Sequence, residues 1–303
     1  MENKFLEKNK VLGINLIYLV SIIPIIIYGF IKNGIIVAKN GYINWFSATK
    51  YLIIPIIIVL LSYVFETYYY LIIKKDEDMH NIYNSLSPYA NVLCYLVCGP
   101  TNYLWLTIPL IIIIDIILKF IDSKITINQV ALFKCILFAL LSIMALESNA
   151  NAYENSLIEV TSKPIDLFLG QGIGEIGTTS SLLAIIGFII LLFNKYYKKE
   201  IPIYSIISYI IVSIIIYFAS AMKFNDILVN TFGSGFFFIA IFAASISTAT
   251  PVVKSGRILY AIIFGTISSI IINIAKFNIG VYILILVLSL LSPLFNKFKL
   301  SLD

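Results

Sequence analysis

The chain has 303 residues, of which 60% are hydrophobic and only 12% are charged, and its formal net charge is +5. Soluble domains are about 45–50% apolar and about 25% charged, so this composition excludes an ordinary soluble protein. The excess of lysine is of the kind that orients a membrane protein, and it requires no nucleic-acid partner.

Apolar residues form long unbroken blocks, such as residues 51–73 and 201–218. A helix of about 18 apolar residues is long enough to cross a hydrocarbon core about 30 Å thick. Barrel strands would show alternating segments of about 10 residues instead. The sequence therefore predicts an all-α polytopic membrane protein, a single membrane domain over residues 1–303 with about ten transmembrane helices.

The expected spans follow one another through mostly short connections. They are 11–31, 51–73, 87–98, 102–121, 131–147, 179–194, 201–221, 233–249, 256–275 and 279–295. The third is short and ends in Gly99-Pro100, which is compatible with a half-span or a tilted helix. The eighth is expected to begin at Gly233-Ser234-Gly235, where small residues allow close helix packing.

Lysine and arginine are distributed unevenly between the loops. With ten spans and the N-terminus inside, about 14 of these residues fall on the inner side and about 6 on the outer side, as the positive-inside rule requires. Both termini are therefore expected in the cytoplasm. The longest polar interval, residues 148–178, is then an extracytoplasmic loop.

Two acidic residues lie within expected spans, Glu66 in the second and Asp115 in the fourth. Charged groups in a bilayer are costly and usually functional, so both residues are candidates for a sodium or proton path. The alternative is that Asp115 pairs with Lys119 near the inner interface. Lys134, at the start of the fifth span, is expected to extend its ammonium group toward the inner surface.

Conventional catalytic and metal-binding patterns are missing from the sequence. There is no Ser–His–Asp set and no phosphate-binding loop, so we predict no catalytic residues and exclude a conventional hydrolase or kinase. His80 stands alone in a polar loop, and no metal site is predicted there. Cys94 and Cys98 share one helix face. They either supply half of a metal site shared with another chain or are small buried apolar residues.

Segment 170–181 has glycines at positions 170, 172, 174 and 177, followed by Thr-Thr-Ser-Ser. Glycines let a backbone turn tightly and approach a ligand, and hydroxyl residues cap a following helix. A helix N-terminus preceded by glycines can bind a phosphate or another anion. The alternative is a re-entrant turn that only caps a membrane helix. The candidate cofactor-binding residues are Gly174, Gly177, Thr178, Thr179 and Ser180.

At these residues the sequence resembles the RnfD protein of the Rnf electron-transport complex and the related NqrB protein of the sodium-pumping NADH:quinone reductase. Residues 174–180, Gly-Glu-Ile-Gly-Thr-Thr-Ser, resemble the family's Gly-Ser-Ile-Gly-Glu-Thr-Ser. Residues 249–257 resemble its Ala-Thr-Asp-Pro…Pro-Lys-Gly-Arg turn in shortened form. Gly99-Pro100 with Trp105 resembles its Pro-Pro…Trp-Trp break, and residues 127–129 stand where the family has Gly-Gln-Asn.

The resemblance implies a flavin mononucleotide carried as a phosphoester on a threonine of the outer loop. The corresponding stretch here is Val160-Thr161-Ser162-Lys163-Pro164, which places Lys163 at the flavin-bearing position and lacks the family's Gly-Ala context. Lysine cannot form this ester, and Thr161 is a weak candidate for it. We therefore expect FMN or riboflavin to be held non-covalently at the glycine turn, or no flavin to be bound.

By resemblance, the chain is a membrane subunit of an Rnf-type ion-translocating electron-transport complex. It would contribute a flavin site and part of the cation path, and it would not bind the nicotinamide itself. The implied partners are the other membrane and peripheral subunits, the lipid bilayer, and sodium ions or protons. The alternative is a flavin-free transporter or scaffold subunit that keeps the fold without the redox role.

Overall fold

A computed structural model describes residues 2–75, 85–99, 103–121, 125–146, 163–172, 174–220 and 222–297. All regular secondary structure within these ranges is helical. The helices are α1 Glu2–Phe30, α2 Val37–Lys39, α3 Trp45–Ala48, α4 Lys50–Tyr68, α6 Ser87–Leu96, α7 Leu104–Phe120, α8 Gln129–Ile143, α10 Pro164–Leu169, α11 Ser181–Leu192, α12 Glu200–Ala219, α13 Phe224–Gly233, α14 Phe236–Phe238, α15 Lys254–Ile270, α16 Ile279–Leu290 and α17 Ser292–Phe295.

Four of these helices continue into π-helical turns, and one short 3-10 turn precedes α15. These turns are Ile31–Ile36 after α1, Tyr69–Ile73 after α4, Ile239–Ala243 after α14, Ile271–Ala275 after α15, and the 3-10 turn Ser247–Ala249.

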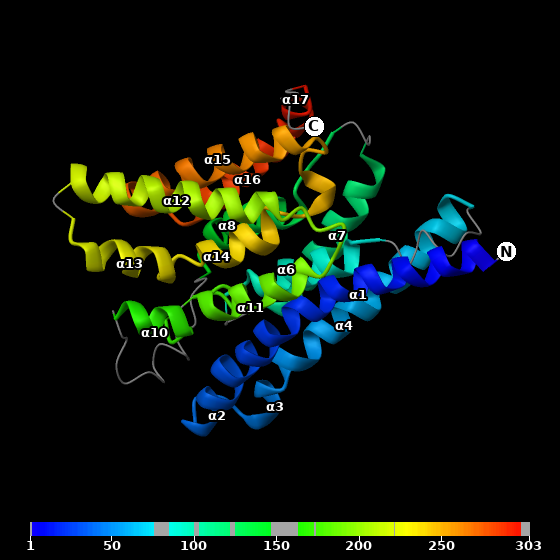
Figure 1. The fold of residues 1–303 in the computed structure, drawn as a ribbon. Coiled ribbons are helices and arrows are strands. Elements are labelled where there is room, and N and C mark those ends of the chain that lie inside the picture. The colour runs from blue at the N-terminus through cyan, green and yellow to red at the C-terminus, as the bar shows by residue number, and fades with distance from the viewer. Residues whose placement is uncertain are drawn as a thin grey trace.

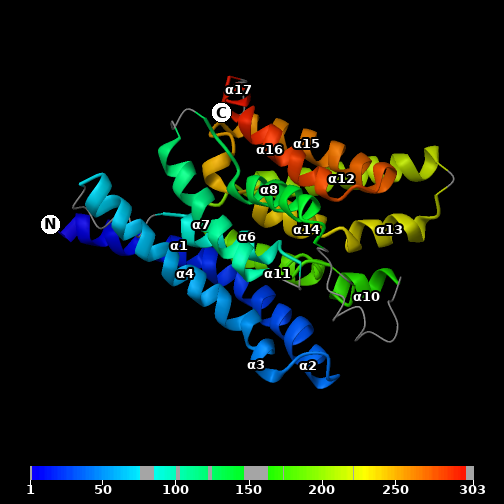
Figure 2. The same cartoon turned by 180° about the vertical axis from the view of Figure 1, so that it is seen from behind.

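The helices form a bundle with two long outer layers and shorter helices between them. Helices α1 and α4 lie together along one side, and α12 packs along α15 next to α16 on the other (Figures 1 and 2). The shorter helices α6, α8, α11 and α14 occupy the middle, with α11 packed on α1 and α8 packed on α16 (Figure 1). The centre of the bundle is therefore built from helices too short to cross a bilayer alone.

Four helical segments in the described part of the chain are long and apolar enough to cross a membrane. They are Leu16–Lys39, Lys50–Ile73, Glu200–Ala219 and Lys254–Ala275. A bent pair, Phe224–Gly233 and Phe236–Ala243, makes a fifth if it counts as one span, and α8, α11 and α16 are shorter apolar helices. The prediction of an all-α, multi-pass membrane protein is confirmed.

Helix α6, at the position of the expected half-span before Gly99-Pro100, is short. It has 10 residues, so it extends about 15 Å, half of a hydrocarbon core about 30 Å thick. Its side chains from Pro88 to Leu96 are all buried, so it lies inside the protein and not against lipid.

The eighth span does not begin at Gly233-Ser234-Gly235, contrary to the expectation from sequence. Helix α13 already starts at Phe224, and the glycines stand at a 51° bend between α13 and the helix over Phe236–Ala243. Gly235 has φ +71°, a left-handed conformation that glycine adopts without strain. The sequence did not indicate α13 as part of a membrane helix, because Asn225, Asp226 and Asn230 lower the hydropathy of this segment.

The turn before α15 is fixed by charged groups from the α11–α12 connection. The Lys198 ammonium donates to Ser247 O at 2.9 Å and to Thr250 Oγ1 at 2.8 Å. Arg257 lies 3.6 Å from Glu200, so a second contact joins α12 to the start of α15. Burial, and then the nearby charge of Arg257, lowers the pKa of Lys198 to about 8.

Candidate functional site

The glycine turn packs into the bundle and meets the end of α6. The backbone N–H of Ile176 donates to Cys98 O at 2.9 Å, and that of Gly177 donates to Leu96 O at 2.8 Å. These bonds satisfy carbonyls that the last turn of α6 leaves without an intrahelical partner. The part of the predicted outer loop nearest α11 is therefore buried against a half-length helix.

Two glycines allow three helix ends to converge at this point. A Cβ atom at Gly177 would lie 2.7 Å from Leu96 Cβ, and one at Gly235 would lie 2.6 Å from Thr178 Cβ. Both distances are too short for real side chains. The end of α6, the start of α11 and the start of α14 come together only because these two positions have no side chain.

The predicted helix cap is present, and Ser180 provides it. Its side-chain oxygen accepts from the backbone N–H of Leu183 at 3.2 Å, at the start of α11. Thr178, Thr179 and Ser180 are all buried. The hydroxyl run therefore starts the apolar helix α11.

The described residues fit a flavin ring poorly at the glycine turn. A ring needs an open face, but neighbouring groups of this chain occupy the space beside each of the four glycines. The nearest atoms to a Cβ placed there belong to Tyr28 at 2.7 Å from Gly170, Leu167 at 2.5 Å from Gly172, Thr179 at 3.0 Å from Gly174 and Leu96 at 2.7 Å from Gly177. The backbone of the turn is used for packing.

Both acidic residues predicted within spans belong to one buried cluster. Lys119 Nζ lies 3.2 Å from Glu66 Oε1 and 3.3 Å from Asp115 Oδ2. The side chains of Glu66 and Asp115 are only 1% and 6% exposed. The predicted pairing of Asp115 with Lys119 is present, and it includes Glu66 from α4. Two carboxylates carry two negative charges and Lys119 carries one positive charge. The cluster as a whole therefore has one negative charge that Lys119 does not balance.

A chain of polar side chains extends from this cluster across α6. Asn91 Nδ2 donates to Asp115 Oδ2 at 3.3 Å and to Ser62 Oγ at 2.8 Å, and Gln129 donates to Asn91 Oδ1. Ser85 donates to Glu66 Oε1, while the other carboxylate oxygen, Oε2, is buried and has no hydrogen-bond partner within the part of the chain that the structure describes. Such an oxygen is costly to bury, and a bound cation or proton would satisfy it.

Lys134 does not extend to the inner surface as the sequence suggested. Its Nζ lies 2.6 Å from Glu175 Oε1, and it donates to Val97 O at 2.7 Å. Glu175 stands in the glycine segment and was not singled out from the sequence. Only the neighbouring glycines could have drawn attention to Glu175 in the sequence, because its partners Lys134 and Tyr282 lie far away in the chain.

Cys94 of α6 and Cys98, two residues beyond the end of this helix, are packed as small buried residues. Cys94 and Cys98 are 0% and 1% exposed, and the Cys98 thiol donates to Cys94 O at 3.3 Å. Neither is placed to share a metal with another chain, because neither reaches the protein surface. Within the described residues, no three His, Cys, Asp or Glu side chains come together as a metal site. His80 and Thr161 lie outside the described residues.

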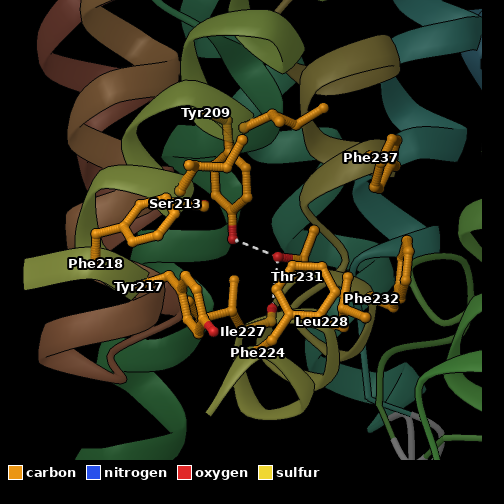
Figure 3. A pocket seen from close by; sticks show the side chains of 12 residues that line it. Tyr209, Ser213, Tyr217, Phe218, Phe224, Ile227, Leu228, Thr231, Phe232 and Phe237 are labelled. Atoms are coloured by element: carbon orange, nitrogen blue, oxygen red, sulfur yellow. Dashed lines mark hydrogen bonds between the residues drawn. The ribbon is translucent and has the colours of Figure 1, made fainter. Parts of the chain in front are cut away.

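An aromatic cleft of about 370 Å³ lies between α12 and α13 (Figure 3). Tyr217, Phe218 and Phe224 border it on one side and Phe232 and Phe237 on the other (Figure 3). The Tyr209 and Thr231 hydroxyls are 3.3 Å apart at this cleft, and the Thr231 hydroxyl also donates to Ile227 O at 2.7 Å (Figure 3). Phe218 is 80% exposed at its edge. The cleft has room for an uncharged ring or an acyl chain, and its lining offers no cation for a phosphate.

Comparison with known proteins identifies relatives of this chain. The model of the NQR2, RnfD, RnfE family matches residues 4–301. The D subunit of a proton-translocating ferredoxin:NAD(+) oxidoreductase complex from Clostridium ljungdahlii is 28% identical over 132 residues, 44% of this chain and 40% of the relative. The D subunit of an ion-translocating oxidoreductase complex from Methanosarcina acetivorans is 30% identical over 113 residues, 37% of this chain and 36% of the relative.

The alignments with these two relatives span about two fifths of their length, whereas the family model spans almost all of this chain. The match confirms the family expected from the glycine segment and from the turn over residues 249–257. The chain is a multi-pass membrane protein and belongs to the NQR2, RnfD, RnfE family.

Proposed function

We propose that this chain is a membrane subunit of an Rnf-type ion-translocating electron-transport complex in a prokaryotic plasma membrane, with both termini in the cytoplasm. The names of the two relatives and the family match support this function. The lysine and arginine distribution supports the orientation. Its partners are the other membrane and peripheral subunits of the complex.

The cation path of the complex includes the Glu66–Asp115–Lys119 cluster. The observation that carries this assignment is the buried Glu66 Oε2, which has no hydrogen-bond partner among the described residues. Glu66 and Asp115 share a single lysine, Lys119. Ionisable groups inside a membrane mark ion and proton pathways in transport proteins. A sodium ion or a proton at this carboxylate would neutralise the remaining charge and satisfy the free oxygen.

We expect Glu66→Gln to reduce cation uptake per electron transferred by about tenfold or more, because it removes the charge that attracts the ion. The assembled complex in proteoliposomes, driven by a reduced ferredoxin with NAD⁺ as acceptor, allows both rates to be measured. Uptake of radioactive sodium and acidification of the lumen separate the two ions.

Glu200→Gln is the matched control. Glu200 pairs with Arg257 at 3.6 Å outside the cluster, and its loss should leave uptake within about twofold. Wild-type vesicles that transfer electrons without moving either ion would refute the proposed function. Normal uptake in Glu66→Gln would remove this cluster from the path and leave the family assignment intact.

Flavin is a separate part of the proposal. We propose that no flavin is attached covalently, because Lys163 precedes Pro164 at the start of α10 and cannot form a phosphoester. Denaturing electrophoresis under ultraviolet light, with the flavin transferase co-expressed, should show no fluorescent band. A band that disappears in Thr161→Ala would restore covalent attachment.

A flavin-free transporter or scaffold subunit is the second candidate. The packed glycine turn favours it, since the space beside all four glycines is taken by this chain's own groups.

If the chain does bind flavin, the aromatic cleft is the place where a flavin ring without its phosphate would find room and aromatic faces to stack on. Extraction of the purified native chain, followed by a flavin assay of the extract, decides between these candidates. Flavin in the extract supports a flavin-binding subunit, and its absence supports the flavin-free one.

A further inference from the structure

Lys134 and Glu175 form a partly buried ion pair that joins four parts of the chain. Lys134 comes from α8 and Glu175 from the glycine turn, and their charged atoms are 2.6 Å apart. The Tyr282 hydroxyl of α16 donates to the other Glu175 oxygen, Oε2, at 3.0 Å. Lys134 also donates to Val97 O, just beyond the end of α6, at 2.7 Å. Each oxygen of the Glu175 carboxylate therefore has a partner, Lys134 for Oε1 and Tyr282 for Oε2.

The pair is less enclosed than the Glu66 cluster. The side chains of Lys134 and Glu175 are 13% and 21% exposed, whereas that of Glu66 is 1% exposed. A small ion can therefore reach Glu175 more easily than it can reach Glu66. The end of α6 points at the pair, and the negative end of a helix dipole favours a cation there.

Helix α6 connects the two charged clusters. Asn91 of α6 contacts Asp115 of the first cluster, and Val97 O contacts Lys134 of the second. Six residues of helix separate these positions by about 9 Å. Between these positions α6 carries Cys94, a small side chain that is fully buried.

We propose that Glu175 is a second station for the monovalent cation, and that Lys134 is the counter-charge which the cation displaces. Lys134 has two acceptors, so it keeps its bond to Val97 O when it leaves the carboxylate. Tyr282 keeps Glu175 in place through the exchange. This inference rests on the proposed function, because it adds a station to the same cation path.

A purely structural role for the Lys134–Glu175 pair predicts a different pattern of transport changes when each partner is removed. If Lys134 and Glu175 only fastened the glycine turn to α8, removal of either partner would loosen the same contact and change transport in the same direction. A displaced counter-charge predicts opposite changes in cation affinity. Without Lys134 the carboxylate is free to bind the ion, whereas without the charge of Glu175 the station is lost.

The test uses the assembled complex in proteoliposomes, with uptake measured against sodium concentration at fixed pH and against pH at fixed sodium. We expect Lys134→Met to lower the half-saturating concentration of the transported cation about tenfold and Glu175→Gln to raise it about tenfold. Tyr282→Phe should produce a smaller change, in the direction of Glu175→Gln. The sodium and pH series show which cation uses the station.

Lys134→Gln provides a second variant in case Lys134→Met does not assemble, because glutamine removes the charge and keeps a hydrogen-bond donor. If neither assembles, Glu175→Gln decides, and an unchanged half-saturating concentration in that variant overturns the proposal. Changes in the same direction for Lys134 and Glu175 variants also overturn it. Lys163→Met, at an exposed lysine, should match the wild type. Absence of uptake in the wild-type complex would instead refute the proposed function itself.

Discussion

Lys119→Met is expected to lower the free energy of unfolding by about 3–5 kcal/mol, because it leaves two buried carboxylates without their shared cation. Lys119 Nζ lies within 3.3 Å of both Glu66 and Asp115, whose side chains are almost fully buried. No other cation is within salt-bridge distance of either carboxylate in the part of the chain that the structure describes. Unfolding of the purified protein in mixed micelles with increasing denaturing detergent measures the change.

A double variant separates the charge from the packing of the lysine stem. In Glu66→Gln/Lys119→Met, one carboxylate is gone, so a substantial part of the lost stability should return. Lys163→Met is the single-residue control, since this exposed side chain should contribute no more than about 0.5 kcal/mol. If Lys119→Met were as stable as Lys163→Met, the cluster would not be an ion pair that the fold depends on.

Gly177→Val is expected to cost about 3 kcal/mol, because it adds a side chain where α6 approaches the turn and displaces two backbone hydrogen bonds. A Cβ atom would lie 2.7 Å from Leu96 Cβ and 3.2 Å from Leu96 O. The bonds from Ile176 to Cys98 and from Gly177 to Leu96 hold the turn in place. The same unfolding assay measures the loss, and limited proteolysis reports whether the turn has left α6.

Two controls test whether the close approach causes this loss. Ile176→Val removes one buried methylene and should cost about 0.5–1.5 kcal/mol. Gly174→Ala should cost less than Gly177→Ala, because the new Cβ atom would meet only the Thr179 methyl group, at 3.0 Å. Equal and small effects at positions 174, 176 and 177 would show that the segment behaves as an ordinary loop.

The local features of the fold were predictable because neighbouring residues determine them. Long apolar blocks determine membrane helices, and Gly99-Pro100 ends a helix that is then too short to span. Ser180 caps α11 through its own backbone neighbours. Asp115 and Lys119 are four residues apart on one helix, so their pairing is also a local property. The family assignment belongs here too, since the resemblance rests on short local segments and the family model matches residues 4–301.

The contacts of the candidate site were decided by the tertiary structure. Glu66 joins Lys119, and Glu175 joins Lys134 and Tyr282, from helices that are distant in sequence. Membrane helices are apolar on every face, so the sequence gives a weak signal for which face turns inward. Which lysine a carboxylate meets therefore depends on how each helix is rotated and how deeply it lies. By itself, the sequence determined the all-helical class, the long apolar helices and the Ser180 cap. Only the packing of α6 against the glycine turn and α8 decided which charges share a site, because burial forces charged groups to pair with whatever partner the fold brings within reach.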